Sequence, residues 1–205
     1  MRRRFSILLG LAILAALPAC SHDGRALADP SPNQTTTTRP PPPTSAPPSE
    51  PSESGLSLSS PDFAPGGPAP ADTTCLGRNV FPDLTWTRVP EGAVELAVTL
   101  SDQTDPKNPL LMWLMAGIDP SETGLTAGTA PAGAFETLND YGNPGYGSPC
   151  LNELSPGSRD MQFRLYVLNE PSGLAPGAPG NDSWDELGAR AVDTATLLMV
   201  VDATG

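Results

Sequence analysis

The segment of residues 21–72 most limits what this chain can fold into, because it contains almost no large apolar residues. Proline, serine and threonine dominate it, with runs of threonine at 35–38 and of proline at 40–43. Such a segment cannot bury enough surface to offset the entropy lost on ordering. We therefore expect residues 20–72 to be a disordered linker and residues 73–205 to form the folded domain. A proline-rich linker extends by about 3 Å per residue. This one is either a spacer that holds the domain away from the membrane or an arbitrary tether.

The N-terminus has the pattern of an export signal. Three arginines at 2–4 precede an apolar run at 5–19, which is shorter than the roughly 20 residues that cross a membrane. The run ends in LPAC at 17–20 and resembles a bacterial lipoprotein signal. That resemblance implies a signal peptide at 1–19, acyl chains such as palmitate on Cys20, and anchoring to the extracytoplasmic side of the cell membrane. The alternative is an ordinary secretory signal followed by an unrelated cysteine.

Charge and histidine content exclude several classes of function. The chain has 23 acidic and 11 basic residues, a formal net charge of -12, so neither nucleic acid nor electrostatic binding to anionic lipid is expected. Its one histidine, His22, precedes the domain. A domain without histidine has no Ser-His or Cys-His nucleophile and none of the usual zinc sites. We therefore expect no enzyme activity, no metal and no cofactor.

Hydrophobic periodicity predicts a mainly β domain. Residues 94–100 and 161–168 alternate between apolar and polar side chains, as half-buried strands do, and 110–118 and 194–201 are apolar, strand-like runs. Ser183, with Glu186 three positions on, has the pattern of a helix N-cap and predicts one short helix near the C-terminus. The fold class expected is mostly antiparallel β with this single helix.

Several motifs resemble one family in order and spacing. Residues 75–86, CLGRNVFPDLTW, resemble the C-x-G-x-N-x-S-P-x-L-x-W opening of bacterial phosphatidylethanolamine-binding, or Raf-kinase-inhibitor-like, proteins. VPEG at 89–92, GNPGYGSPC at 142–150 and FRLYVL at 163–168 continue the match. The resemblance covers residues 75–202 and implies an antiparallel β-sandwich with an anion pocket at one end.

The chain departs from the family at the expected pocket. The D-P-D-A-P signature reads DQTDP at 102–106, which keeps Asp102 but replaces the second carboxylate with Thr104. Met112 replaces the histidine that follows this signature. In the G-x-H-R signature, GSRD here, Arg159 stands at the histidine. Both pocket histidines of the family are therefore absent.

The resemblance still implies a set of residues around a small pocket. They are Asp102, Tyr146, the backbone of Gly145, Tyr146 and Gly147, and Arg159. Backbone N–H groups beside glycine can approach a phosphate or carboxylate closely, and a guanidinium can pair with such an anion through two N–H bonds. In the alternative interpretation, Arg159 lies in an exposed turn and the pocket is vestigial.

Cys75 and Cys150 remain once Cys20 is assigned to lipid. An even pair in an exported protein predicts a disulfide, and it would contribute on the order of 4 kcal/mol in the chain-entropy model. The alternative is a pair of buried free thiols, since family members in the cytosol carry both positions.

We therefore expect a lipid-anchored, extracytoplasmic, non-catalytic protein of the phosphatidylethanolamine-binding type. Its expected partners are the membrane, through Cys20, and a small anion or phosphate headgroup. The alternative is a protein-interaction or inhibitor module that has lost the pocket, as the resemblance to inhibitory family members implies. A hydrolase with chemistry that does not need histidine is a third reading.

Overall fold

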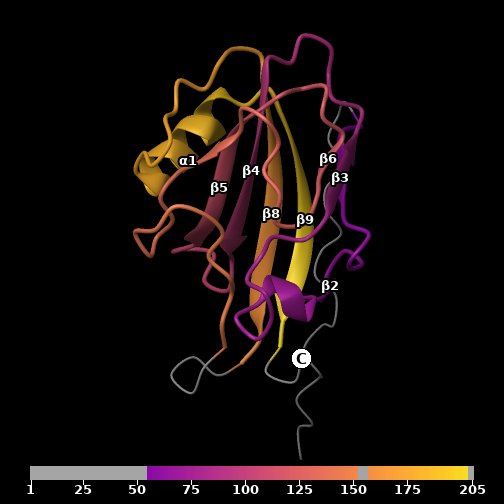
Figure 1. The fold of residues 1–205 in the computed structure, drawn as a ribbon, viewed down its shortest axis with the longest axis vertical. Coiled ribbons are helices and arrows are strands. Elements are labelled where there is room, and N and C mark those ends of the chain that lie inside the picture. The colour runs from indigo at the N-terminus through magenta and orange to yellow at the C-terminus, as the bar shows by residue number, and fades with distance from the viewer. Residues whose placement is uncertain (1–54, 152–156, 203–205) are drawn as a thin grey trace, which may run out of the picture. The chain divides into compact units, whose positions relative to one another are not determined.

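The computed structural model describes residues 55–151 and 157–202, and their strands form two β-sheets (Figure 1). The larger sheet has the strand order β2-β9-β8-β4-β5-β7, and the smaller has the order β1-β3-β6. The bounds are β1 Ser57–Ser59, β2 Gly67–Pro68, β3 Leu84–Thr87, β4 Glu95–Asp102, β5 Leu110–Ile118, β6 Gly124–Leu125, β7 Phe135–Glu136, β8 Arg159–Leu168 and β9 Asp193–Val201, with the 3-10 helix η1 at Ala71–Thr73 and the helix α1 at Gly180–Arg190.

The predicted mainly β architecture with one helix is confirmed. The four apolar runs identified in the sequence coincide with the four long strands β4, β5, β8 and β9. These strands pair with one another in antiparallel register. One pair is parallel, because the two-residue strand β2 lies parallel to β9, with Gly67 beside Met199, so the sheet is mostly antiparallel as expected.

The larger sheet buries both of its faces. Alternate residues of β8, from Met161 through Phe163 to Val167, lie in the main core between the two sheets. Tyr166 points to the opposite face and joins a second apolar cluster with Leu187 of α1. In Figure 1, accordingly, α1 and the β3–β6 pair lie on opposite sides of the larger sheet. All eight residues of β4, the strand between β5 and β8, are buried.

The predicted boundary between linker and domain at residue 72 is wrong for residues 55–72. Strand β1 pairs with β3, with Leu58 opposite Trp86, and both Leu58 and Phe63 are buried. Phe63 packs 6.2 Å from Phe163, measured between ring centroids. A pattern of two leucines alternating with serines is too short to predict a strand by itself, and β1 is stabilised by a partner far along the chain. The rest of the predicted linker and the signal segment, 1–54, lie outside the described residues.

The helix α1 begins four residues earlier than the sequence predicted, since its N-cap is Pro179 instead of Ser183. Ser183 lies inside the helix, where its hydroxyl donates to the Pro179 carbonyl at 2.7 Å. Proline is favoured at a helix start because its missing N–H has no helical partner there. Gly180 follows because a Cβ at that position would collide with the Leu138 carbonyl. Within 55–151 and 157–202, no helix has both the length and the apolar character needed to cross a bilayer.

Replacing Phe63 with alanine tests whether this segment belongs to the core. Phe63→Ala should lower the free energy of unfolding by about 3–5 kcal/mol, because it removes a buried aromatic ring that contacts Phe163. Urea denaturation followed by tryptophan fluorescence measures the loss. Leu76→Ala, at an exposed site, is the control and should change stability by less than about 0.5 kcal/mol. Equal stability of the two variants would contradict this and indicate that residues 55–72 belong to the linker.

Candidate functional site

A cavity of about 520 Å³ opens where strands β4, β5 and β8 come to the same end of the larger sheet. Asp102 ends β4, Leu110 begins β5 as its register partner, and Arg159 begins β8. A second segment, 147–150, closes one side. The cavity is lined by Asp102, Leu110, Met112, Tyr141, Gly147, Ser148, Pro149, Cys150 and Arg159.

A β-bulge directs Met112 to this cavity. The β4–β5 register passes from Leu100 opposite Trp113 to Ser101 opposite Leu111, so Met112 is the extra residue. Bulges of this kind bend a strand and re-aim a side chain. The Met112 carbonyl accepts the Gly147 N–H at 2.9 Å. Met112 therefore supplies an apolar wall and also fixes the start of the segment that faces it.

Asp102 and Arg159 form an ion pair in the cavity wall. An Arg159 guanidinium nitrogen lies 2.6 Å from Asp102 Oδ2, and the Thr104 N–H donates to Asp102 Oδ1 at 2.9 Å. The Asp102 side chain is 6% exposed and that of Arg159 is 25% exposed. Both carboxylate oxygens are thus already engaged. Asp102 therefore holds the Arg159 guanidinium in place at the cavity wall.

The protonation of Asp102 follows from these contacts. Burial by itself raises the pKa of the carboxyl, but hydrogen bonds from Thr104, and the hydrogen bond and charge of Arg159, outweigh it. The net pKa of Asp102 lies below its ordinary value of 3.8. The carboxylate is therefore charged at neutral pH and cancels one positive charge in the cavity. Arg159 is the one cation and Asp102 the one anion among the residues that line it.

Part of the backbone expected to cradle an anion is committed elsewhere. The Gly147 N–H donates to the Met112 carbonyl, and the Ser148 N–H donates to Asn79 Oδ1 at 3.1 Å. Gly147 lines the cavity, and a Cβ there would come within 2.7 Å of the Met112 carbonyl oxygen. Glycine is therefore required for close packing of this loop on β5, rather than for approach to a ligand.

The structure places Tyr146 and Gly145 outside the residues that line the cavity. The Tyr146 ring packs edge-on against Trp113 and Phe81, and its hydroxyl donates to the Thr73 carbonyl at 3.1 Å. Burial raises the pKa of this hydroxyl well above its ordinary value, an effect that exceeds the opposing hydrogen bond. Tyr146 therefore holds the loop to the core and does not face the cavity.

Asn139 organises the loop that leads to the cavity, and sequence reasoning missed it. Its side-chain oxygen accepts the N–H groups of Tyr141 and Asn143, and its amide donates to the Gly145 carbonyl at 3.2 Å. This buried amide presents Tyr141 at the cavity, where the ring is 59% exposed. An asparagine before a Gly-rich turn is a usable signal, since its side chain can satisfy backbone groups in the turn.

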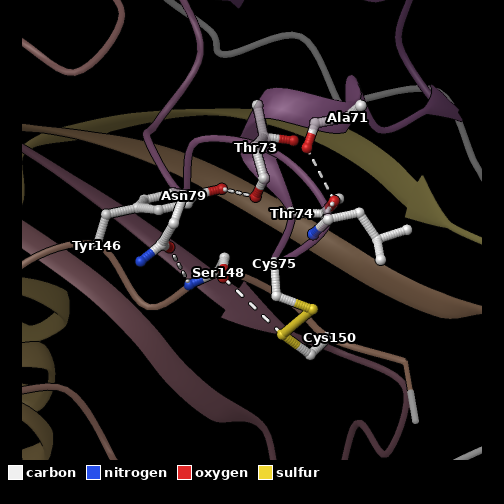
Figure 2. Close-up of a disulfide and its surroundings, with 9 residues drawn as sticks. Ala71, Thr73, Thr74, Cys75, Asn79, Tyr146, Ser148 and Cys150 are labelled. Carbon is white, nitrogen blue, oxygen red and sulfur yellow. Dashed lines mark hydrogen bonds between the residues drawn. A yellow bond between two sulfur atoms is a disulfide. The ribbon is translucent and has the colours of Figure 1, made fainter.

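A disulfide joins Cys75 to Cys150, with the two Cα atoms 5.5 Å apart, so the predicted pairing is present (Figure 2). Cys150 lines the cavity, and the bond ties it to the exposed turn that follows η1. Asn79 and Thr73, from the same stretch of chain, bind Ser148 and Tyr146 in Figure 2. The other predicted modification site, Cys20, lies outside the described residues.

In comparisons with known proteins, a family model and several relatives match most of this chain. Residues 59–201 match a family model described as phosphatidylethanolamine-binding protein. A Mycobacterium tuberculosis protein named "Putative lipoprotein LppC" is 34% identical over 189 residues, which cover 92% of this chain and 91% of the relative. A UPF0098 protein of Methanothermobacter thermautotrophicus is 32% identical and covers 70% of this chain and 96% of its own.

Solved structures share the same fold. Escherichia coli YbcL, described as a new member of the mammalian PEBP family, aligns with a TM-score of 0.66 and 25% identity. The alignment covers 72% of this chain and 98% of YbcL. The PEBP homologue CT736 of Chlamydia trachomatis aligns with a TM-score of 0.63 at 23% identity and supports the fold alone.

The ion pair predicts a specific pH dependence of stability. The folded pKa of Asp102 is depressed, so its stabilising contribution is present above the unfolded pKa and disappears as the pH falls through the folded pKa. At pH 7, Asp102→Asn should lower the free energy of unfolding by about 1.5–3 kcal/mol, the range for hydrogen bonds to charged groups. As the pH falls below 3.8 and through the depressed folded pKa of Asp102, the wild type and the variant should converge. Urea titrations at neutral and at acidic pH measure this.

Asp160→Asn serves as the control for that experiment, because Asp160 is an exposed carboxylate next to Arg159 on β8. Its stability should track the wild type at both pH values. A gap between Asp102→Asn and the wild type that persists unchanged at low pH would contradict an ion-pair role for Asp102.

Proposed function

Because this chain belongs to the phosphatidylethanolamine-binding protein family, we propose that it is a lipid-anchored, extracytoplasmic binding protein that catalyses no reaction. Its ligand on this proposal is a small anion or a phosphate-bearing headgroup held at Arg159. The observation that carries the proposal is the position of the Arg159 guanidinium, which Asp102 fixes at the edge of a cavity of about 520 Å³.

The geometry of Arg159 favours an anion. Within the described residues, the hydrogen bonds of its guanidinium account for one nitrogen, which donates to Asp102. The remaining N–H groups are available to a phosphate or carboxylate oxygen, and a guanidinium held in place loses little freedom on binding. Because Asp102 offsets the charge and the Gly147 and Ser148 N–H groups are committed, we expect weak, millimolar to sub-millimolar binding at this single cation.

The chemistry of the lining residues supports a non-catalytic role. A general base must be able to accept a proton near neutral pH, and the Asp102 carboxylate has both oxygens engaged and a lowered pKa. Cys150 is held in the disulfide, so it presents no thiolate as a nucleophile. Neither histidine nor lysine is among the residues that line the cavity.

A protein partner is the second candidate. Tyr141 and Leu110 are exposed apolar side chains at the cavity, and the ion pair leaves that region without net charge. Exposed aromatic and aliphatic side chains around a hollow suit a protein contact better than a small polar ligand. This reading predicts no response to small anions.

Titration with inorganic phosphate and phosphoethanolamine tests the proposed ligand class. The amide resonances of Gly147, Ser148 and Arg159 should shift saturably, because these residues border the cavity. Arg159→Ala should abolish the shifts, and Arg159→Lys should weaken binding roughly tenfold, since an ammonium lacks the planar fork. NMR spectra recorded across the titration measure both effects.

Arg164→Ala is the matched control for that titration. Arg164 lies on the same strand as Arg159 but outside the residues that line the cavity, so its loss should leave binding unchanged. If no resonance moves at millimolar ligand, the anion proposal fails and the protein-partner reading takes its place.

The anchor makes a separate prediction. In a bacterial host the full chain should incorporate labelled palmitate and fractionate with membranes, whereas Cys20→Ala should do neither, because the acyl thioether needs the Cys20 sulfur. Radiolabelling and membrane fractionation measure the difference. Cys75→Ala provides the control, because that cysteine is committed to the disulfide. Unlabelled wild-type protein would identify the N-terminus as an ordinary secretory signal.

A further inference from the structure

The disulfide lies where solvent and the cavity meet. Cys75 is an exposed residue, and its partner Cys150 lines the cavity. Figure 2 shows the two sulfur atoms between the turn after η1 and the segment that carries Ser148. A disulfide buried in the core would be closed to thiols, whereas an accessible one can be attacked by a thiolate.

The two sides of the bond are held very differently. On the Cys75 side, the turn is closed by its own contacts: Thr74 and Gly77 make backbone hydrogen bonds within it, and Arg78 pairs with Asp72 at 2.9 Å. A Cβ at Gly77 would collide with Asp72, which shows how tightly this turn is folded. The turn therefore keeps its shape without the disulfide.

The Cys150 side depends on the bond more strongly. We call residues 148–150 the cavity wall. Tyr146 before it and Leu151 after it pack on the core, and Pro149 is itself buried. Between those anchors, the hydrogen bond that ties the wall to the turn is the one from the Ser148 N–H to Asn79, at an exposed site. Loss of the disulfide would leave the fold intact and loosen the wall locally.

Leu76 adds an independent observation. It follows Cys75 directly and is 77% exposed, the highest value among the large apolar side chains of the described residues. An apolar side chain so exposed contributes little to the core, but it would be buried by a protein that docks over the disulfide.

We propose that the Cys75–Cys150 disulfide is an exchange site for a protein that carries a vicinal dithiol, and that its reduction loosens the cavity wall. The second part rests on the proposed function, since it concerns the same ligand site. One thiolate of the dithiol attacks Cys75 Sγ, which breaks the disulfide and releases Cys150 as a thiolate. The second thiol of the dithiol then displaces Cys75. The dithiol protein is oxidised to its own disulfide, two electrons pass to this protein, and both cysteines take up protons.

The exchange is tested on the full chain, purified in detergent, with thioredoxin kept reduced by its reductase and NADPH, and separately with dithiothreitol. Mass spectrometry after thiol alkylation follows Cys75 and Cys150. Leu76→Ser should slow reduction by thioredoxin about tenfold, because the docking contact is lost, and leave the rate with dithiothreitol unchanged. Val94→Ser, an exposed apolar site just before the opposite end of β4, is the matched control and should match the wild type with both reagents.

Two results would overturn the exchange site. One is a disulfide that resists both reagents until denaturant is added. The other is an equal rate with thioredoxin for Leu76→Ser and the wild type. Neither readout involves a ligand, so the test stands even if the cavity binds no anion.

The loosened wall is tested by amide exchange and phosphate titration of the oxidised and reduced protein. Reduction should speed hydrogen exchange at Ser148 and Cys150 but not at Gly77, and near-UV circular dichroism should keep its folded signature. Phosphate affinity should fall about fivefold, the lower end of typical coupling between sites. Unchanged exchange at the wall would overturn the coupling. If the oxidised protein binds no phosphate while wall exchange responds to reduction, the proposed ligand fails and the coupling to the wall survives.

Discussion

Strand β4 is buried along its whole length, and the rest of the fold is arranged to cover it. Strands β5 and β8 satisfy its two edges, the smaller sheet covers one face, and the cluster around α1 covers the other. Each end of β4 carries a buried carboxylate, which must be paired because unpaired buried charge is costly. At the first residue, Glu95 accepts the N–H groups of Gly117 and Ser172 at 2.9 and 2.8 Å. At the last residue, Asp102 accepts hydrogen bonds from the Thr104 N–H and the Arg159 guanidinium. The cavity is thus a consequence of how a buried strand ends.

The need to pair Asp102 explains the effect of replacing the two histidines of the family motifs. A neutral imidazole beside Asp102 would leave the carboxylate underpaired, whereas the Arg159 guanidinium compensates it and still keeps donors to spare. Met112 at the bulge then needs only to fill apolar space, and it is 2% exposed. In this chain the charged partner of Asp102 therefore lies on β8, and the Met112 position on β5 serves packing.

Sequence patterns were sufficient for the long strands and insufficient for the contacts between distant segments. Strands β5 and β8 can be recognised because each run carries its own pattern of apolar residues. Strand β1 contains a single leucine and depends on β3, where Ser57 pairs with Thr87, 30 residues away. The motif resemblance identified Asp102 and Arg159 as cavity residues. It did not predict the hydrogen bond between them, which joins residues 57 positions apart. Tyr146 was misplaced because residue type cannot show which way a loop aromatic points. Its direction is decided by the Thr73 carbonyl, 73 positions earlier in a stretch with no motif of its own.

Different contacts near the disulfide hold different parts of the loop at residues 146–150. The Tyr146–Thr73 hydrogen bond is partly buried and lies beside the stacked rings of Phe81 and Trp113, so it fixes where the loop enters the core. The Asn79–Ser148 hydrogen bond is exposed, competes with water, and contributes little on its own. Between these two, the covalent bond is what orders the part of the loop that faces the cavity. A sandwich core with apolar layers on both faces of β4 has no need of such a bond for its own cohesion. Its placement at the cavity edge therefore ties it to the site rather than to the core.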